Sequence, residues 1–224
     1  MKKTKLFLNA LIKFLFGLVL VGAILFLPAG SFSYTGAWLF IALLFIPMIF
    51  LGVALFIKAP ELLEKRLSAK EKEDTQKGVV ALSGLLFLGG FIVAGIDYRF
   101  GWSHVPTWLV VVSSVVLLVS YALYAEVMRE NAYLSRTIEV QQGQKVVDTG
   151  LYGVVRHPMY AVTVWLFLSI PLVLGSFWSL LCFAHYPILM IVRILNEEKV
   201  LTEGLDGYAD YKKKVKYRLL PFIW

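Results

Sequence analysis

The sequence predicts an all-α protein, a polytopic membrane bundle of about six helical spans. The chain has 224 residues, of which 59% are hydrophobic, and its mean hydropathy is +0.75, whereas soluble domains are roughly 45–50% apolar. The apolar residues form blocks close to the ~20 residues that a helix needs to cross a bilayer. This length suits one integral membrane domain, residues 1–224, without a separate soluble domain.

The first apolar block, 6–27, follows the basic start MKKTK. The apolar core of a signal peptide is about 7–15 residues long and leads to a small-residue cleavage site. This block is longer and no such site follows it, so we expect a retained first span. We expect the other spans at 37–57, 78–96, 106–125, 158–174 and 177–195.

Only Gly175 and Ser176 separate the last two expected spans. Two residues suffice for a tight turn, so these spans are predicted to form a helical hairpin. At about 1.5 Å per residue, the span 158–174 barely reaches across the hydrocarbon core. It is therefore short enough to be tilted or only partly inserted.

The charges predict the orientation. Six spans place both termini and the loops 58–77 and 126–157 on one side, and every Lys and Arg except Arg99 falls there if Lys13 is counted with the N-terminus. Cytoplasmic loops carry an excess of basic residues. We therefore expect both termini in the cytoplasm, below a bacterial or archaeal plasma membrane.

The loop 58–77 mixes basic and acidic residues, and Leu62, Leu63 and Leu67 share one face if it is helical. It can be a short interfacial helix whose lysines snorkel to water. A solvated linker is an equally good interpretation at this point.

Composition also limits the partners. The net charge of +7 could indicate nucleic acid, but the basic residues lie between spans, where they set topology and contact lipid headgroups. Membrane lipids are therefore the expected partners, and nucleic acid is not. The single Cys182 excludes an internal disulfide and a multi-cysteine metal site. We find no HExxH, GxGxxG or Ser/His/Asp pattern, and we expect no metal.

The longest polar stretch, 129–156, holds short extended runs at 137–140 and 145–147, with Gly143 and Gly150 between and after them. An extended backbone offers N–H and C=O groups to a ligand. Directly after this stretch, Pro158 suits the first turn of a helix, which places His157 at the N-cap beside the positive helix end. On its own, the tripeptide RHP equally fits a plain helix start with an arginine touching lipid phosphate.

Arg193 and Glu197 are four residues apart and share a helix face, whereas Glu198 is turned by about 100°. An ordinary i,i+4 ion pair is the simplest explanation. A cofactor or substrate site is the alternative, because arginine can bind a carboxylate or phosphate with two parallel hydrogen bonds and a glutamate can accept from a cationic amine.

These residues together resemble a known family. GLYGVVRHPMY at 150–160, the apolar hairpin, R-x-x-x-E-E at 193–198 and GYADYKKKVKYRLLPFI at 207–223 resemble the isoprenylcysteine carboxyl methyltransferases. The wider relatives are the membrane phospholipid methyltransferases. The resemblance covers about residues 126–224, which it marks as the cofactor-binding and catalytic region behind four N-terminal spans in 1–125.

The resemblance implies S-adenosyl-L-methionine as the methyl donor and a lipophilic or prenylated substrate. Arg193 and Glu197 would be catalytic, and Arg193 would orient the substrate's nucleophile. The donor would be held by the extended segment, the RHP segment and the paired glutamates: Gln144, Lys145, Val146, Val147, Tyr152, His157, Pro158, Met159, Tyr160, Glu197 and Glu198.

Carboxyl O-methylation of an isoprenylcysteine-like or other lipid carboxylate is the favoured activity. Phospholipid N-methylation is the main alternative, and a nicotinamide-dependent, sterol-reductase-like membrane enzyme is another. A transporter or purely structural membrane protein is less favoured, because the middles of the spans carry few charges.

Overall fold

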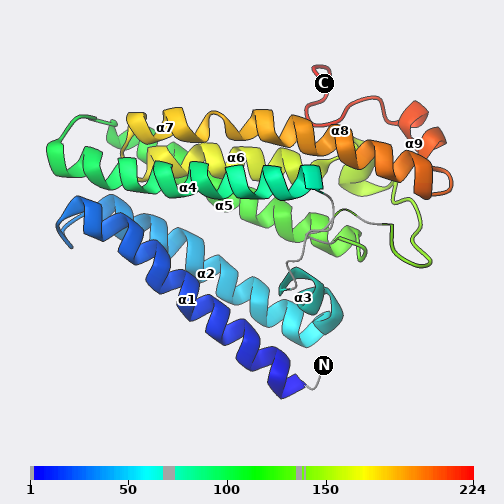
Figure 1. Cartoon of the computed structure of the whole chain (residues 1–224), viewed down its shortest axis with the longest axis horizontal. Helices are drawn as coiled ribbons and strands as arrows, with labels where there is room; N and C mark the ends of the chain where they lie inside the picture. Colours follow the sequence, from blue (N-terminus) through cyan, green and yellow to red (C-terminus); the bar gives the residue numbers. More distant parts are fainter. Residues whose placement is uncertain (1–2, 68–73, 135–137, 139) are drawn as a thin grey trace.

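The computed structural model describes residues 3–67, 74–134, 138 and 140–224. In these residues it contains helices and no strand, which confirms the all-α prediction (Figure 1). The membrane-type helices are α1 (Lys3–Ala29), α2 (Thr35–Lys58), α4 (Asp74–Phe100), α5 (Thr107–Glu130), α6 (Pro158–Val173), α7 (Phe177–Phe183) and α8 (Tyr186–Gly204). Three short elements complete the order: α3 (Pro60–Leu67), the 3₁₀ turn η1 (Gly150–Gly153) and α9 (Tyr208–Lys214).

Five stretches are long and apolar enough to cross a membrane: α1, α2, 76–100, α5 and the α7–α8 stretch 177–204. The sixth expected span is α6, which has 16 residues and is shorter than the others. The bundle is therefore polytopic as predicted, with the short span where the sequence placed it.

The last span differs from the prediction of one helix over 177–195. It is broken at Ala184 and His185, and α8 then continues to Gly204. The break precedes Pro187 in the first turn of α8, because proline has no N–H to continue the ladder of α7 and its ring clashes with the preceding turn. The helical hairpin itself is confirmed, since Gly175 takes a positive φ of 79° and Ser176 Oγ accepts from Ser179 N at 3.0 Å.

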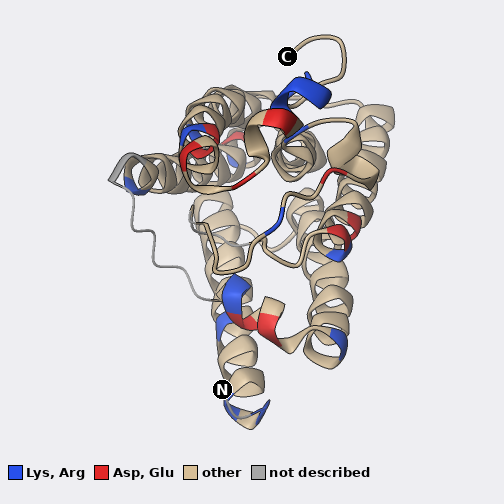
Figure 2. Cartoon of the chain, turned by 90° about the vertical axis from the view of Figure 1, so that its right-hand side faces the viewer, with Lys and Arg blue, Asp and Glu red and all other residues tan. Residues whose placement is uncertain are grey.

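The bundle has one charged end. α3, the loop after α5, the start of α6, the end of α8 and α9 all lie at the same end as the two termini (Figure 1). Viewed from that side, Figure 2 shows acidic and basic residues on several of these elements around the end of the bundle. The sequence-based grouping of charges on one side therefore agrees with the fold.

α3 is a helix, as one of the two interpretations of 58–77 expected, and Leu62 and Leu63 are buried. It connects the N-terminal hairpin to the rest of the charged end. Lys13 Nζ on α1 donates to Leu67 O at 2.6 Å, and Lys65 Nζ donates to Gln141 Oε1 at 2.7 Å. Residues 68–73, which follow α3, lie outside the described part.

The opposite end is held by a buried carboxylate, that of Asp97 at the end of α4. It accepts from Ser103 N at 2.7 Å, from Ser103 Oγ at 2.6 Å and from Ser176 Oγ. A buried carboxylate is costly unless hydrogen bonds satisfy it, and these donors tie the α4–α5 turn to the α6–α7 turn. The apolar core between the two ends is built around Leu25, Phe40 and Phe183, which are fully buried.

Candidate functional site

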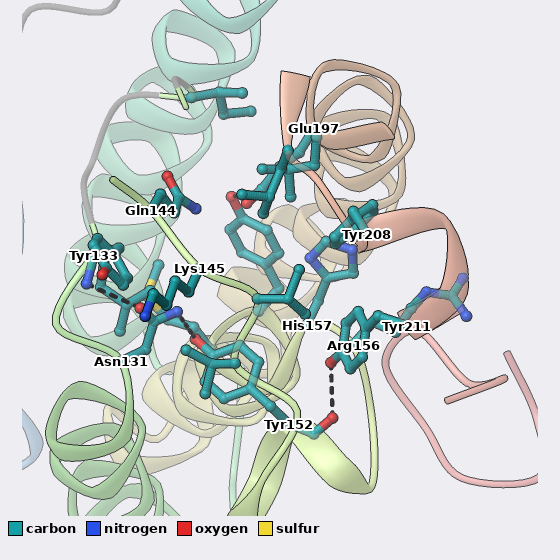
Figure 3. Close-up of a pocket in the computed structure, with 18 of the residues that line it drawn as sticks. Asn131, Tyr133, Gln144, Lys145, Tyr152, Arg156, His157, Glu197, Tyr208 and Tyr211 are labelled. Carbon is teal, nitrogen blue, oxygen red and sulfur yellow. Dashed lines mark hydrogen bonds between the residues drawn. The ribbon is translucent and has the colours of Figure 1, made fainter. Parts of the chain in front are cut away.

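A cavity opens at the charged end of the bundle and encloses about 840 Å³ of empty space, part of it open to solvent. Four elements form its walls: the loop after α5, the segment that leads into α6, the second half of α8, and α9. Figure 3 shows side chains from these elements turned toward a common space. Residues from 131 to 211, far apart in the sequence, thus meet in one pocket.

The segment that leads into α6 is fixed at its start by Gly150. This glycine has a positive φ of 54°, and a Cβ there would lie 1.7 Å from Glu130 Oε1. The Glu130 carboxylate accepts from Leu151 N at 2.9 and 3.2 Å. The turn is therefore clamped to the end of α5, and η1 follows at once.

His157 is the N-cap of α6, with Pro158 in the first turn, as the sequence predicted. Its side chain makes no capping hydrogen bond. The ring instead stacks against Tyr160 at a centroid distance of 5.7 Å and an interplanar angle of 26°. The imidazole therefore packs against the first turn of α6 without capping it.

Tyr160 connects the two predicted catalytic side chains. Its hydroxyl donates to Glu197 Oε2 at 2.5 Å and accepts from Arg193 Nε at 3.0 Å, and the Arg193 guanidinium lies 5.8 Å from the Tyr160 ring centre. All three side chains line the cavity. A hydrogen-bond chain therefore fixes the Glu197 carboxylate from one side and leaves Oε1 for other partners.

Glu198 was expected to help hold the donor, but it does not line the cavity, because adjacent helical residues are turned by about 100°. It is buried and accepts from Arg156 Nε at 2.7 Å and from Arg218 Nε at 3.0 Å. The His157 Nε2 atom also faces this carboxylate, 3.4 Å from Glu198 Oε1. This carboxylate is already neutralised by two guanidinium groups and serves the packing of the C-terminal tail.

The tail also pairs with the RHP segment through the backbone. Arg156 N donates to Tyr217 O and His157 N donates to Arg218 O, both at 2.9 Å. Arg156 Nη1 donates to Val215 O at 2.7 Å and to Lys216 O at 2.8 Å. The tail is thus bound to the residues just before α6.

Three tyrosines form the wall that faces the extended loop. Asn131 Nδ2 donates to the Tyr152 hydroxyl at 3.0 Å, and the Tyr211 hydroxyl donates to Tyr152 O at 2.7 Å. Burial raises the pKa of the Tyr208 hydroxyl well above its usual range, and the negative charges of Glu198 and Glu197 raise it further. Tyr208 therefore keeps its proton at physiological pH and can donate a hydrogen bond.

The buried Tyr208 hydroxyl of the pocket has no hydrogen-bond partner. Buried polar groups are almost always paired, so this exception calls for an explanation. Tyr208 lines the cavity, and a free donor there is the arrangement expected where a polar ligand binds. His157 Nε2, in contrast, already faces the Glu198 carboxylate.

The extended run at 144–147 lines the cavity without forming a strand. Its start is fixed by Gly143, whose φ is 72°, and by Gln141 N, which donates to Gln144 Oε1 at 2.9 Å. Tyr133 OH donates to Gly143 O at 3.1 Å. Within the other expected run, residues 137 and 139 lie outside the described part, and Ile138 lines the cavity.

The structure brings together ten of the sequence-predicted site residues in this cavity: Gln144, Lys145, Val146, Val147, Tyr152, His157, Met159, Tyr160, Arg193 and Glu197. Two predicted residues do not line it. Glu198 is held by Arg156 and Arg218, and Pro158 faces a different groove on the other side of the segment.

Sequence reasoning missed the other lining residues: Asn131, Tyr133, Leu134, Ile138, Arg156, Leu201, Leu205, Tyr208 and Tyr211. Two signals pointed toward some of them. Arg156 belongs to the RHP motif, and Tyr208 and Tyr211 belong to the tail motif GYADY. The apolar lining residues could not be identified from the sequence, because an apolar residue beside a cavity cannot be distinguished there from one in the core.

The second groove is almost entirely apolar. It lies between α5, α6 and the C-terminal tail, and it is lined by Leu151, Val155, Pro158, Trp165 and Leu219 among others. The segment 151–159 therefore separates two surfaces, with Tyr152, Arg156, His157 and Met159 on the cavity side. As for metals, the part of the chain that the structure describes contains no group of three His, Cys, Asp or Glu residues suited to hold one.

Comparison with known proteins finds similarity in this same region of the chain. Residues 105–206 match the family of phospholipid methyltransferases. An uncharacterized protein of Bacillus subtilis (strain 168), YpbQ, is 32% identical over 98 residues, which cover 43% of this chain and 58% of that relative. The matched residues 105–206 include all cavity-lining residues except Tyr208 and Tyr211. The half of the chain that forms the cavity is therefore similar to the phospholipid methyltransferases, which confirms the predicted resemblance at the level of the wider membrane methyltransferase superfamily.

Proposed function

We propose that this chain is an integral membrane methyltransferase that uses S-adenosylmethionine and methylates the carboxylate of a lipophilic substrate. The observation that carries the proposal is the cavity at the charged end. It joins a fixed carboxylate, an arginine and the unpartnered Tyr208 hydroxyl, and all of its lining except Tyr208 and Tyr211 lies within the region similar to methyltransferases.

The chemistry of the cavity fits this donor. The donor's α-ammonium needs an acceptor, and Glu197 offers a carboxylate that Tyr160 holds in place. Its carboxylate needs donors, which the N-terminal end of α6 and Lys145 can supply. The unpartnered Tyr208 hydroxyl is a further site for a hydrogen bond with the donor.

When bound, S-adenosylmethionine supplies a methyl group that its sulfonium has already activated. A carboxylate is ionised at neutral pH, so this chain need not provide a general base for it. The task of Arg193 is then to hold the acceptor in line with the methyl group, which is a proximity effect. The surrounding Leu201, Leu205 and Val146 exclude water from the reacting groups.

Phospholipid N-methylation is the second candidate, and the description of the matching family favours it. An amine acceptor has to lose a proton, so one of Glu197, Glu198 or His157 would have to accept it. Glu198 already accepts from two arginines. This leaves fewer groups for a base, and it is why we favour a carboxylate acceptor.

The first test is calorimetric titration of the detergent-purified protein with S-adenosylhomocysteine, and with a nicotinamide dinucleotide in parallel. We expect micromolar binding of the former alone. In Glu197→Gln, loss of a charge-assisted hydrogen bond should weaken this binding at least about tenfold. In Arg193→Ala, donor binding should remain while methyl transfer falls about 100-fold, because the acceptor is misplaced.

Lys199→Ala is the matched control, because Lys199 is an exposed cation on the same helix as both site residues. It should bind and transfer like the parent protein. Normal donor affinity in Glu197→Gln would contradict the role given to that carboxylate. Binding of the dinucleotide alone would move the protein to the reductases.

A further inference from the structure

Gln76, near the start of α4, is fully buried, and neither its Nε2 nor its Oε1 has a hydrogen-bond partner. A primary amide can donate twice and accept twice, and desolvating it without any partner is costly. An apolar residue would fill this position better if it only packed. A buried, unpartnered amide in a membrane bundle is therefore a candidate contact for a polar ligand group.

The position of the Gln76 amide along α8 follows from how the antiparallel helices α4 and α8 are aligned. The rings of Phe87 on α4 and Tyr186 on α8 are 5.5 Å apart, and Val79 on α4 shares a core cluster with Ile194 on α8. Both helices rise about 1.5 Å per residue and turn by about 100°. Gln76 is eleven residues before Phe87, so it lies on nearly the same face, and Glu197 is eleven residues after Tyr186.

Gln76 therefore lies beside the turn of α8 that carries Arg193 and Glu197. Figure 1 agrees, because α4 begins alongside α8, near the charged end of the bundle. Gln76 itself does not line the cavity described above. By this register it flanks the Arg193–Glu197 turn from α4.

A second unpartnered amide points to the same place. Asn196 Nδ2 is buried without a hydrogen-bond partner. Asn196 is seven residues after Leu189, which belongs to the cluster that contains Val79 of α4. Residues seven apart lie on nearly the same helix face, so Asn196 lies on the side of α8 that carries Leu189 into this cluster. It does not pair with Gln76, because neither polar atom of the Gln76 amide has a hydrogen-bond partner.

We propose that Gln76 and Asn196, next to Arg193, form the subsite for the polar head of the acceptor, and that this head is a carboxylate. The proposal rests on the proposed function. Two amide N–H donors beside a guanidinium suit a carboxylate, which is anionic and accepts hydrogen bonds only. A cationic amine would bring its charge next to Arg193 and its own N–H groups next to these donors. Next to this subsite, α4 and α8 pack through apolar residues such as Val79, Leu189 and Ile194, so a hydrocarbon chain attached to the head would meet apolar side chains.

The test compares three probes that share one hydrocarbon chain and differ in the head: oleate, oleylamine and oleyl alcohol. Radiolabelled oleate is bound to the protein in nanodiscs with saturating S-adenosylhomocysteine, and the other two compete. We expect oleate to bind at least tenfold more tightly than oleylamine. Gln76→Met, which keeps the length of the side chain, and Asn196→Leu should each weaken oleate binding about tenfold.

Gln76→Glu should weaken oleate binding further by repulsion and should improve oleylamine binding. Gln142→Met makes the same chemical change at an exposed position outside the cavity and should change nothing. Gln76→Met should melt no lower than the parent protein, since an unpaired buried amide is lost, and this excludes misfolding as the cause of any effect.

Affinity for S-adenosylhomocysteine is measured separately by calorimetry and should stay within twofold in every variant. Its absence from the parent protein would refute the proposed function itself. Oleate binding that is unchanged in Gln76→Met and Asn196→Leu would overturn the subsite. A parent protein that prefers oleylamine, or binds none of the three probes, would overturn the carboxylate assignment.

Discussion

Gly150 shows how one residue fixes the geometry of the cavity. It combines a backbone conformation that L-residues rarely adopt with a space that Glu130 already fills. The neighbouring Gly143 shares the positive φ, but a Cβ there would meet open space. Substituting alanine at each glycine therefore distinguishes the energetic cost of the left-handed backbone conformation from the cost of the steric clash with Glu130.

We expect Gly143→Ala to cost about 1–2 kcal/mol, the penalty for a left-handed residue, which corresponds to a melting temperature about 2–8 °C lower. Gly150→Ala should lower it further, because Glu130 must also release Leu151 N. It should weaken donor binding as well, since Tyr152 follows directly. Melting curves and calorimetry on both variants check this, and equal behaviour of the two would contradict the clamp.

At this scale the sequence showed that Glu197 and Glu198 are turned by about 100° from each other, although both were expected to hold the donor. It could not assign which glutamate faces the cavity from that step alone. That depends on Arg156 and Arg218, which reach Glu198 from segments 42 and 20 residues away in the sequence. Such long-range partners leave no trace in local spacing.

Among the elements, the C-terminal tail has the largest effect on the site. It supplies two backbone acceptors to the N–H groups of Arg156 and His157, and Arg218 from the tail reaches Glu198. Removing Glu198 would leave the buried Arg156 charge uncompensated, which typically costs several kcal/mol. Arg218 is the milder probe, because its side chain is 29% exposed.

We expect Arg218→Ala to fold and to bind the donor about 3–10-fold more weakly, a loss of about 1 kcal/mol, because the tail holds the RHP segment less firmly. Lys216→Ala is the control: its side chain is exposed, and its backbone oxygen still accepts from Arg156. Calorimetry with S-adenosylhomocysteine measures the effect. Equal affinities in the two variants would show that the Arg218–Glu198 pair does not support the cavity.

The helices themselves were largely predictable, since their apolar blocks are long, but their ends were not. Hydropathy marks the part of a helix that lies in lipid, whereas α5 continues to Glu130 and α8 to Gly204 through polar turns. The break before Pro187 was also missed, because flanking apolar residues concealed it. Tyr208 and Tyr211 line the cavity because α9 folds back against it, and no local sequence pattern specifies where α9 lies.

The whole molecule has two ends of different character. One carries the cavity and, among the residues that the structure describes, most of the basic ones, and the other carries the Asp97 network with Arg99 nearby. The excess of basic residues predicts that the cavity end faces the cytoplasm. A soluble donor would then reach the cavity from the cytoplasm, while an apolar acceptor arrives from the bilayer.

Single cysteines in a Cys182→Ser background can test this orientation. Ser33→Cys lies in the α1–α2 turn at the far end, and Lys213→Cys lies on α9 at the cavity end, and both positions are exposed. On intact cells, a membrane-impermeant maleimide should label the first at once and the second only after permeabilisation. The reverse pattern would place the cavity outside the cell.

The two faces of the segment 151–159 contact different environments. Tyr152, Arg156, His157 and Met159 face the polar cavity, whereas Leu151, Val155 and Pro158 face an apolar groove beside α5. A single stretch of backbone carries both sets of side chains, so a shift of the groove-facing residues also displaces the cavity-facing ones. The detergent or lipid chain that fills the groove therefore contacts the same backbone segment that shapes the cavity and can change the cavity's geometry. For this reason, donor affinities should be compared only between samples prepared in the same amphiphile.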